Sequence, residues 1–306
     1  MSSEWPELDY GIWSATCDTL HAHTQVLGKL CVALAPPEPQ LLHAALHLSA
    51  RGWETRPLPA PDGSGALVAA LDLHSHEAVA EHSDGRSEWV ALTPDRPVGQ
   101  ITRELLDAVS RLGGKVEIDP TPQEVPWTVP LDEDEEHATY DADQVGIYFD
   151  AATRAALVLA DFRAPYRGRS TAVNAWWGSF DLAVSLFSGI PADPPSDDFI
   201  MRNSMDSEEV EIGWWPGDPR YDRTAFYAYA HPAREGFAEG TLSPAAAHWQ
   251  PDLGLFALDW DDVRVASDPH ALALEFAHSA FRHACEVCGW DPALPASAEG
   301  SPPPVA

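Results

Sequence analysis

The chain is short of positive charge and of cysteine. Its 306 residues include 18 Lys and Arg against 48 Asp and Glu, a formal net charge of −30, and the only lysines are Lys29 and Lys115. Such a field repels phosphate backbones and anionic lipid, so we expect neither nucleic acid nor a membrane surface as a partner. Four cysteines are too few for a disulfide scaffold in a chain of this length.

Long apolar runs are also missing. No stretch of about 18 apolar residues occurs, which predicts no membrane-spanning helix. The first residues, MSSEWPELDYG, lack the basic region and apolar stretch of a secretory signal. Together with the few cysteines, these absences predict a cytoplasmic protein.

The composition is otherwise that of a globular protein, with 45% hydrophobic residues and 12 Trp, in a chain long enough for one large domain or two ordinary ones. The stretch 170–189, STAVNAWWGSFDLAVSLFSG, is the most aromatic segment. From Phe180 onward its apolar residues alternate with other side chains, including Asp181. A period of two predicts a strand with one buried face.

Periodicity predicts helices and short strands in both halves of the chain. We expect helices over residues 5–30, 97–112, 142–162 and 269–288, and strands over 30–34, 42–49, 54–58, 66–74, 87–92, 116–118, 170–189, 210–215, 226–229 and 255–259. Residues 121–136 combine prolines with an acidic run, which is typical of a linker. The sequence thus predicts an α+β fold of two halves, each an antiparallel sheet flanked by helices: residues 1–130 and 131–291, with a disordered tail over 292–306.

The two halves share one local pattern. In each, the first helix is followed by glycine and a cation, Gly28-Lys29 and Gly168-Arg169, and then by strands. We interpret this as a degenerate internal duplication. Two related halves often form a ligand cleft where they meet.

A polar stripe runs along the first predicted helix. His21, Gln25 and Lys29 follow one another at intervals of four, so they share one side of the helix beside its apolar face. Such a stripe can line a cleft. The alternative is an ordinary polar border of the helix.

Three further residues carry groups for acid–base chemistry. Asp181 lies within an aromatic strand, where a carboxylate must be paired, protonated or exposed to a cleft; pairing with Arg169 is the alternative to a site. Asp134 and His137 combine a carboxylate with an imidazole, although the same acidic segment could be a solvated linker.

The histidines and cysteines do not form a complete ligand set for zinc. Cys285 and Cys288 are a single pair near a helix C-terminus, where the helix dipole opposes thiolate formation. We therefore expect no tightly bound metal, and the sequence identifies no cofactor.

Several motifs occur together in order: Trp5-Pro6-x-Leu8, Thr19-Leu20-His21-x-x-Thr24-Gln25-x-x-Gly28-Lys29, Ala50-Arg51-Gly52, Asp132-Glu133-Asp134-x-x-His137-x-x-Tyr140-Asp141, Trp177-Gly178-Ser179-Phe180-Asp181-Leu182-Ala183, Trp215-Pro216-Gly217 and Ala225-Phe226-Tyr227-Ala228-Tyr229-Ala230. With these the chain resembles, from about residue 5 to 290, an uncharacterised bacterial family of unknown function numbered 5996. The resemblance implies no known activity. The family pattern has His where this chain has Asn174, and Lys where it has Arg169; Asn174 could still donate a hydrogen bond to a ligand.

Two functional hypotheses follow. The first is an enzyme for a small polar molecule, with His21 and Asp181 as acid–base groups in a cleft between the halves. Its ligand-binding candidates are Gln25, Lys29, Arg51, Asp134, His137, Asn174 and Trp177. We expect His21, Gln25 and Lys29 to face the same cavity as Trp177 and Asp181. The second hypothesis is a non-catalytic module that binds a small ligand or a protein.

Overall fold

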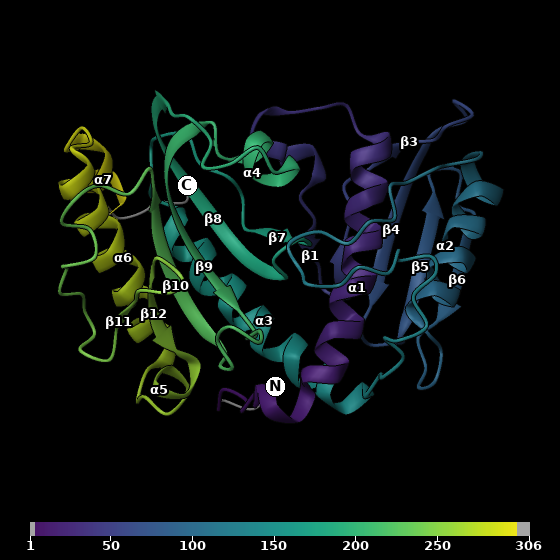
Figure 1. The fold of residues 1–306 in the computed structure, drawn as a ribbon, viewed down its shortest axis with the longest axis horizontal. Helices are drawn as coiled ribbons and strands as arrows, with labels where there is room; N and C mark the ends of the chain where they lie inside the picture. The colour runs from purple at the N-terminus through teal and green to yellow at the C-terminus, as the bar shows by residue number, and fades with distance from the viewer. Residues whose placement is uncertain (1–3, 299–306) are drawn as a thin grey trace, which may run out of the picture. The chain divides into compact units, whose positions relative to one another are not determined.

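The computed structural model describes residues 4–298 (Figure 1). The chain forms two compact units that are not consecutive in sequence. One comprises residues 11–149 and 175–180 and is called the N-sheet unit; the rest of the described chain forms the C-sheet unit. Within the described residues, no helix is long and apolar enough to cross a membrane.

The N-sheet unit is built on an antiparallel sheet with the order β1-β2-β4-β5-β6, and β3 pairs with β4. Its elements are α1 (Tyr10–Leu34), the 3-10 helix η1 (Pro39–Ala44), β1 (His47–Leu48), β2 (Gly52–Glu54), β3 (Leu58–Pro59), β4 (Ala66–Asp72), β5 (Glu77–His82), β6 (Ser87–Ala91) and α2 (Val98–Gly113). Helix α2 packs on β4, β5 and β6. It does so through buried Ile101, Leu105, Ala108 and Leu112, which recur at helical spacing.

The C-sheet unit contains the antiparallel order β11-β12-β10-β9-β8-β7. Its elements are β7 (Asn174–Trp176), β8 (Asp181–Pro191), α4 (Phe199–Ser204), β9 (Ser207–Trp215), β10 (Ala225–His231), β11 (His248–Gln250), β12 (Leu255–Asp259), α5 (Trp260–Arg264), α6 (Pro269–Cys288) and α7 (Ala293–Ala298). Helix α3 (Ala142–Arg163) begins in one unit and ends in the other, and only Asn174 of β7 belongs to this unit. Helix α6 packs on β9, β10 and β12.

The two faces of the β8–β10 sheet differ in chemistry. Leu182 pairs with Trp214 and Val184 with Ile212, so these residues share one apolar face. Asp181 and Ser185 alternate with them and therefore lie on the opposite face. Both Asp181 and Ser185 are nevertheless buried.

The predicted fold class is confirmed: the protein is α+β, with two antiparallel sheets and flanking helices. Helices α2, α3 and α6 lie within one residue of their expected bounds. Whether residues 1–130 and 131–291 form separate halves that arose by duplication stays a prediction.

Several predicted elements were wrong. Residues 30–34 complete α1 because Leu27, Leu30 and Cys31 continue its buried stripe. Residues 116–118 form no strand. A turn at 177–180 divides the expected long strand into β7 and β8. Residues 293–298 form helix α7 instead of a disordered tail, and residues 299–306 lie outside the described part.

Candidate functional site

A cluster of carboxyl and phenol groups occupies the polar face of the C-sheet unit. Strand register places Ser185 opposite Glu211, and Glu211 opposite Tyr229. Because alternate residues share a face, this face presents Asp181 and Ser185 from β8, Glu209 and Glu211 from β9, and Tyr227 and Tyr229 from β10. Asp181, Glu209 and Glu211 are all less than one-tenth exposed.

Gly213 allows the central contact of this cluster. It pairs with Tyr227 across the β9–β10 ladder, and a Cβ at this position would lie 2.3 Å from the Tyr227 ring. The missing side chain lets the ring lie over the strand. Any residue other than glycine would displace the phenol from its carboxyl partners.

The hydroxyl of Tyr227 contacts two carboxyl groups. Its oxygen lies in hydrogen-bonding contact with Oδ2 of Asp181 and 2.9 Å from Oε1 of Glu211. The hydroxyl of Ser185 donates to the other oxygen of Glu211 over 2.8 Å. A phenol has one hydrogen, so it can donate to only one of the two carboxylates. Both contacts are hydrogen bonds only when one carboxyl group is itself protonated.

The surroundings favour a retained proton on this face. Burial raises the pKa of Glu211, against the effect of its hydrogen bonds from Ser185, Tyr227 and Tyr229. Burial, followed by the charges of Glu211 and Asp206, raises the pKa of Glu209 well above its ordinary value. The Arg169 guanidinium acts in the opposite direction on Glu209. These carboxyl groups therefore keep their protons to a higher pH than an exposed glutamate does.

In the N-sheet unit, His21 holds the turn that precedes Asp181. Its Nε2 lies 2.9 Å from the carbonyl oxygen of Trp177 and 3.0 Å from that of Gly178. Carbonyl oxygens only accept, so this nitrogen carries the hydrogen. The His21 ring stacks on Phe180 with centroids 5.0 Å apart.

Phe180 has a left-handed backbone, with φ 56°. A non-glycine residue in this region stores about 1 kcal/mol or more of strain. Stacking on Trp53 and Tyr148, with ring centroids 5.1 and 5.3 Å away, helps to hold it. The strained residue immediately precedes Asp181, and such strain is concentrated at functional sites.

Gln25 and Lys29 follow His21 on α1. The Gln25 amide donates to the carbonyl of Gln123 and accepts from its backbone N–H, both over 2.9 Å. Lys29 lies over the Trp177 ring, with Nζ 5.4 Å from the centroid.

Asp134 and His137 form a hydrogen-bonded pair in the same unit. Their Oδ2 and Nδ1 atoms are 2.7 Å apart. This hydrogen bond raises the pKa of His137. Burial acts to raise the pKa of Asp134, but hydrogen bonds from His137 and two backbone amides lower it. Trp127 packs against His137 at 4.4 Å and against His21 at 5.2 Å between ring centroids.

The sequence-predicted residues therefore fall into three groups. His21, Gln25, Lys29 and Trp177 are linked in the N-sheet unit, and Trp127 connects His21 to the Asp134–His137 pair. Arg51 lies apart from them, bound to Glu54 and Glu81 at 2.8 and 2.6 Å. Asp181 and Asn174 belong to the C-sheet unit. A cavity shared by His21 and Asp181 stays a prediction.

Asn174 and three residues of the carboxyl–phenol cluster differ in how well the sequence predicted them. Asn174 is buried, and its Nδ2 has no hydrogen-bond acceptor among the described residues. Sequence reasoning missed Glu211, Tyr227 and Tyr229. Their signal was the alternation Glu-x-Glu on one predicted strand and Tyr-x-Tyr on the next, which places polar groups on a common face.

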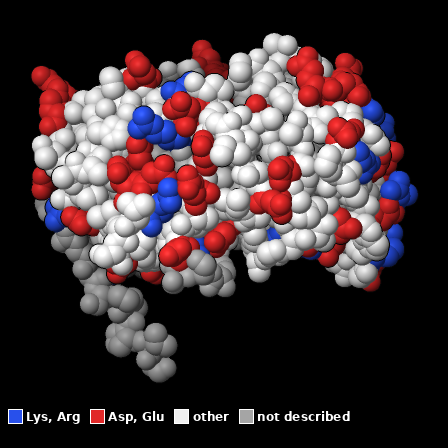
Figure 2. All heavy atoms as spheres, turned by 90° about the horizontal axis from the view of Figure 1, so that it is seen from below, with Lys and Arg blue, Asp and Glu red and all other residues white. Residues whose placement is uncertain are grey.

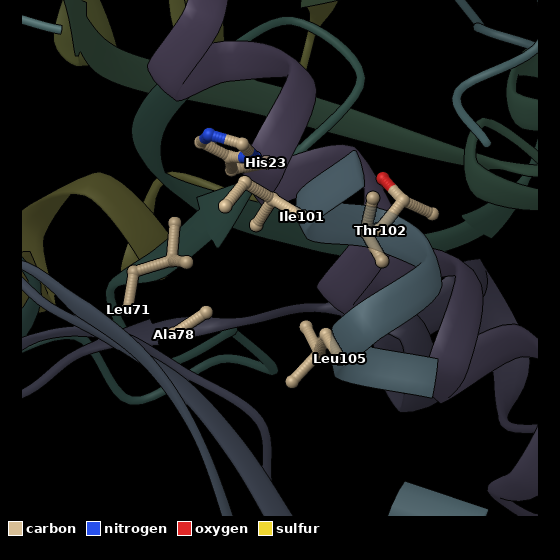
Figure 3. A pocket seen from close by; sticks show the side chains of 7 residues that line it. His23, Leu71, Ala78, Ile101, Thr102 and Leu105 are labelled. Carbon is tan, nitrogen blue, oxygen red and sulfur yellow. The ribbon is translucent and has the colours of Figure 1, made fainter. Parts of the chain in front are cut away.

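His23 faces a different environment from His21. With Leu71, Ala78, Ile101 and Leu105 it lines a void with no space for a water molecule (Figure 3). Burial lowers its pKa to about 4, although Asp134 acts in the opposite direction. This small apolar void is a packing feature and not a ligand site.

Within residues 4–298, no group of three or more His, Cys, Asp or Glu side chains is placed to hold a metal ion.

Comparison with known proteins gives one match. No curated protein and no solved structure matches the chain. The model of a family of unknown function, DUF5996, matches residues 5–296. Because the match covers nearly the whole chain, the protein belongs to the DUF5996 family.

Proposed function

We propose that this protein is an enzyme that performs acid–base chemistry on a small polar molecule. The observation that supports this most is the single Tyr227 hydroxyl in contact with both Asp181 and Glu211. A carboxylic acid, a phenol and a carboxylate in series can deliver a proton at one end and accept one at the other. A cytoplasmic location remains part of the proposal.

Each residue has a distinct role in this proposal. Glu211 is the general acid, because burial raises its pKa. Asp181 is the base, and Tyr227 connects the two. His21 is a positioning residue: its Nε2 hydrogen is shared by two carbonyls of the turn before Asp181, so it is not available for transfer to a substrate.

The charge of the face indicates the substrate class. Asp181, Glu209 and Glu211 present three carboxyl groups, and Arg169 is the cation that acts on Glu209. A negative site favours a neutral or cationic reacting group over an anion. The same excess of carboxyl groups supports a second candidate function, a module that binds a small cation without converting it.

The test compares variants in a mixture of small molecules. Purified protein is incubated with a bacterial metabolite extract, and mass spectrometry follows compounds that disappear and those that co-purify. We expect the wild type to convert at least one compound, and Glu211→Gln to slow this conversion by roughly 10²–10⁴-fold. Glu235→Gln, at an exposed position of the same unit, is the control and should remain active.

The outcomes separate the hypotheses. A compound that co-purifies unchanged, and is lost in Asp181→Asn, indicates the binding module. Conversion that continues at the wild-type rate in folded Glu211→Gln contradicts the proposed acid.

A further inference from the structure

Lys29 is a buried cation that lacks an ordinary partner. The residue is 4% exposed. Within residues 4–298 its ammonium has no hydrogen-bond acceptor; its contacts are the face of Trp177 and the electrostatic attraction of Asp119. The other lysine, Lys115, is opposite in character: its side chain is 80% exposed and pairs with Glu117 at 2.6 Å.

Such an environment is unfavourable for an ammonium group. Lys carries three N–H donors, and placing them where water has little access and no protein acceptor is present is unfavourable without a compensating charge. The cation–π contact with Trp177 offsets only part of this cost. Burial accordingly lowers the pKa of Lys29, and Asp119 acts in the opposite direction. An anion within hydrogen-bonding distance would supply both a hydrogen-bond acceptor and a compensating negative charge.

The side chains beside Lys29 are held by contacts with the backbone, which favours a defined binding geometry. The Trp177 indole N–H donates to the carbonyl of Ala44 over 3.0 Å. A Cβ on Gly28 would lie 2.1 Å from the indole, so the ring rests directly on the helix backbone beside Lys29. One turn earlier, the Gln25 amide is fixed by its two bonds to Gln123.

The same segment contains a second polar atom without a partner. Oε1 of Gln123 is buried and has no donor among the described residues. Gln123 is the residue whose backbone pairs with Gln25, so α1 and this segment present an unmatched donor and an unmatched acceptor. A carboxylate ligand that also carries an N–H or O–H group could satisfy both.

We propose that Lys29 binds the carboxylate of a small monoanionic ligand. Recognition of a phosphate dianion commonly uses Arg forks or several donors, whereas this site offers one ammonium with Asp119 nearby. The net charge of −30 also opposes multiply charged anions, and Figure 2 shows that acidic side chains outnumber basic ones on the face it presents. This site is independent of the acid–base cluster, and its test needs no enzymatic activity.

The first experiment uses matched variants, Lys29→Met and Lys115→Met. Binding of acetate, benzoate, glycolate and inorganic phosphate is measured by ligand-observed NMR, and unfolding by urea titration. We expect the wild type and Lys115→Met to bind a carboxylate alike, and Lys29→Met to bind it about tenfold more weakly or not at all. Phosphate should bind more weakly than the carboxylates. Because Lys29 has no hydrogen-bond acceptor in the described chain, Lys29→Met should keep or increase the urea midpoint.

The second experiment compares the chemical modification of Lys29 and Lys115 within one sample of the wild-type protein. Acetic anhydride acylates amines, and mass spectrometry of peptides reports each lysine separately. An added carboxylate ligand that binds in the first experiment should slow the acylation of Lys29 and leave that of Lys115 unchanged. Equal effects on both lysines, unchanged binding by Lys29→Met, or no binding of any carboxylate would overturn the proposal. A lower urea midpoint in Lys29→Met would instead assign the ammonium a structural role and would also overturn it.

Discussion

At the scale of single residues, His23 shows how burial controls a titratable group. It is 3% exposed and lies among apolar side chains of β4, β5 and α2. Its pKa falls from 6.5 to about 4. At about 1.4 kcal/mol per unit, that difference corresponds to about 3 kcal/mol of stability linked to pH.

The sign of this linkage follows from proton binding. Between pH 6.5 and 4 the unfolded state binds the proton and the folded state does not, so stability is present above pH 6.5 and is lost as pH falls. We predict that His23→Leu flattens the acid decline of the free energy of unfolding in this window. Urea titrations at a series of pH values measure it.

The control for this experiment is His74→Gln, at an exposed position. It should leave the acid decline as it is in the wild type. An unchanged decline in His23→Leu would show that other groups cause the loss.

At the scale of elements, the close approach of Trp177 to α1 depends on a glycine. A Cβ on Gly28 would lie 2.1 Å from the indole, whereas a Cβ on Gly146 in α3 would meet nothing within 4 Å. We predict that Gly28→Ala destabilises the protein by about 1–3 kcal/mol through overpacking. Gly146→Ala should stabilise it by about 0.5–1 kcal/mol, because alanine favours a helix.

Thermal and urea unfolding of the two variants measure this difference. The contrast between two glycines in helices separates packing from helix propensity. Equal effects of both substitutions would contradict the close approach of the indole.

Sequence patterns predicted the helices and strands whose periodicity is visible within the segment itself. Helices α2 and α6 have complete apolar stripes at helical spacing, and their bounds were predicted within a residue. Strand β5 was missed because its central residues, Ala78–Ala80, are all buried and therefore show no alternation. The turn at 177–180 was missed because Phe180 needs its tertiary contacts with His21, Trp53 and Tyr148 to hold a left-handed backbone.

The candidate site was predictable only where it depends on spacing within one element. The stripe of His21, Gln25 and Lys29 on α1 follows from spacing within one helix. The contact of Asp181 with Tyr227, and of Tyr227 with Glu211, depends on strand register between β8, β9 and β10. Register is a property of paired strands and is not contained in any one segment.

At the scale of the whole molecule, the formal charge of −30 counts every Asp and Glu as ionised. Burial raises the pKa of Glu209 and of Glu211, so these two groups become charged at a higher pH than exposed glutamates do. Their linkage has the opposite direction to that of His23: an acid whose pKa is raised on folding contributes stability at low pH, and this contribution is lost as pH rises above 4.5 and through the folded pKa. The acid cluster therefore favours the folded state at low pH, where protonation of His23 disfavours it.

The protonation of Glu211 is the most direct test of the proposed acid–base chain. Carbon-13 NMR of the side-chain carboxyl groups follows Glu211 in the full chain as pH is varied, and Glu211→Gln identifies its signal. We predict a titration midpoint above the ordinary value of 4.5, together with a change in that midpoint when Tyr227→Phe removes the shared hydroxyl. A Glu211 carboxyl that titrates at or below 4.5, and does not respond to Tyr227→Phe, would contradict the account.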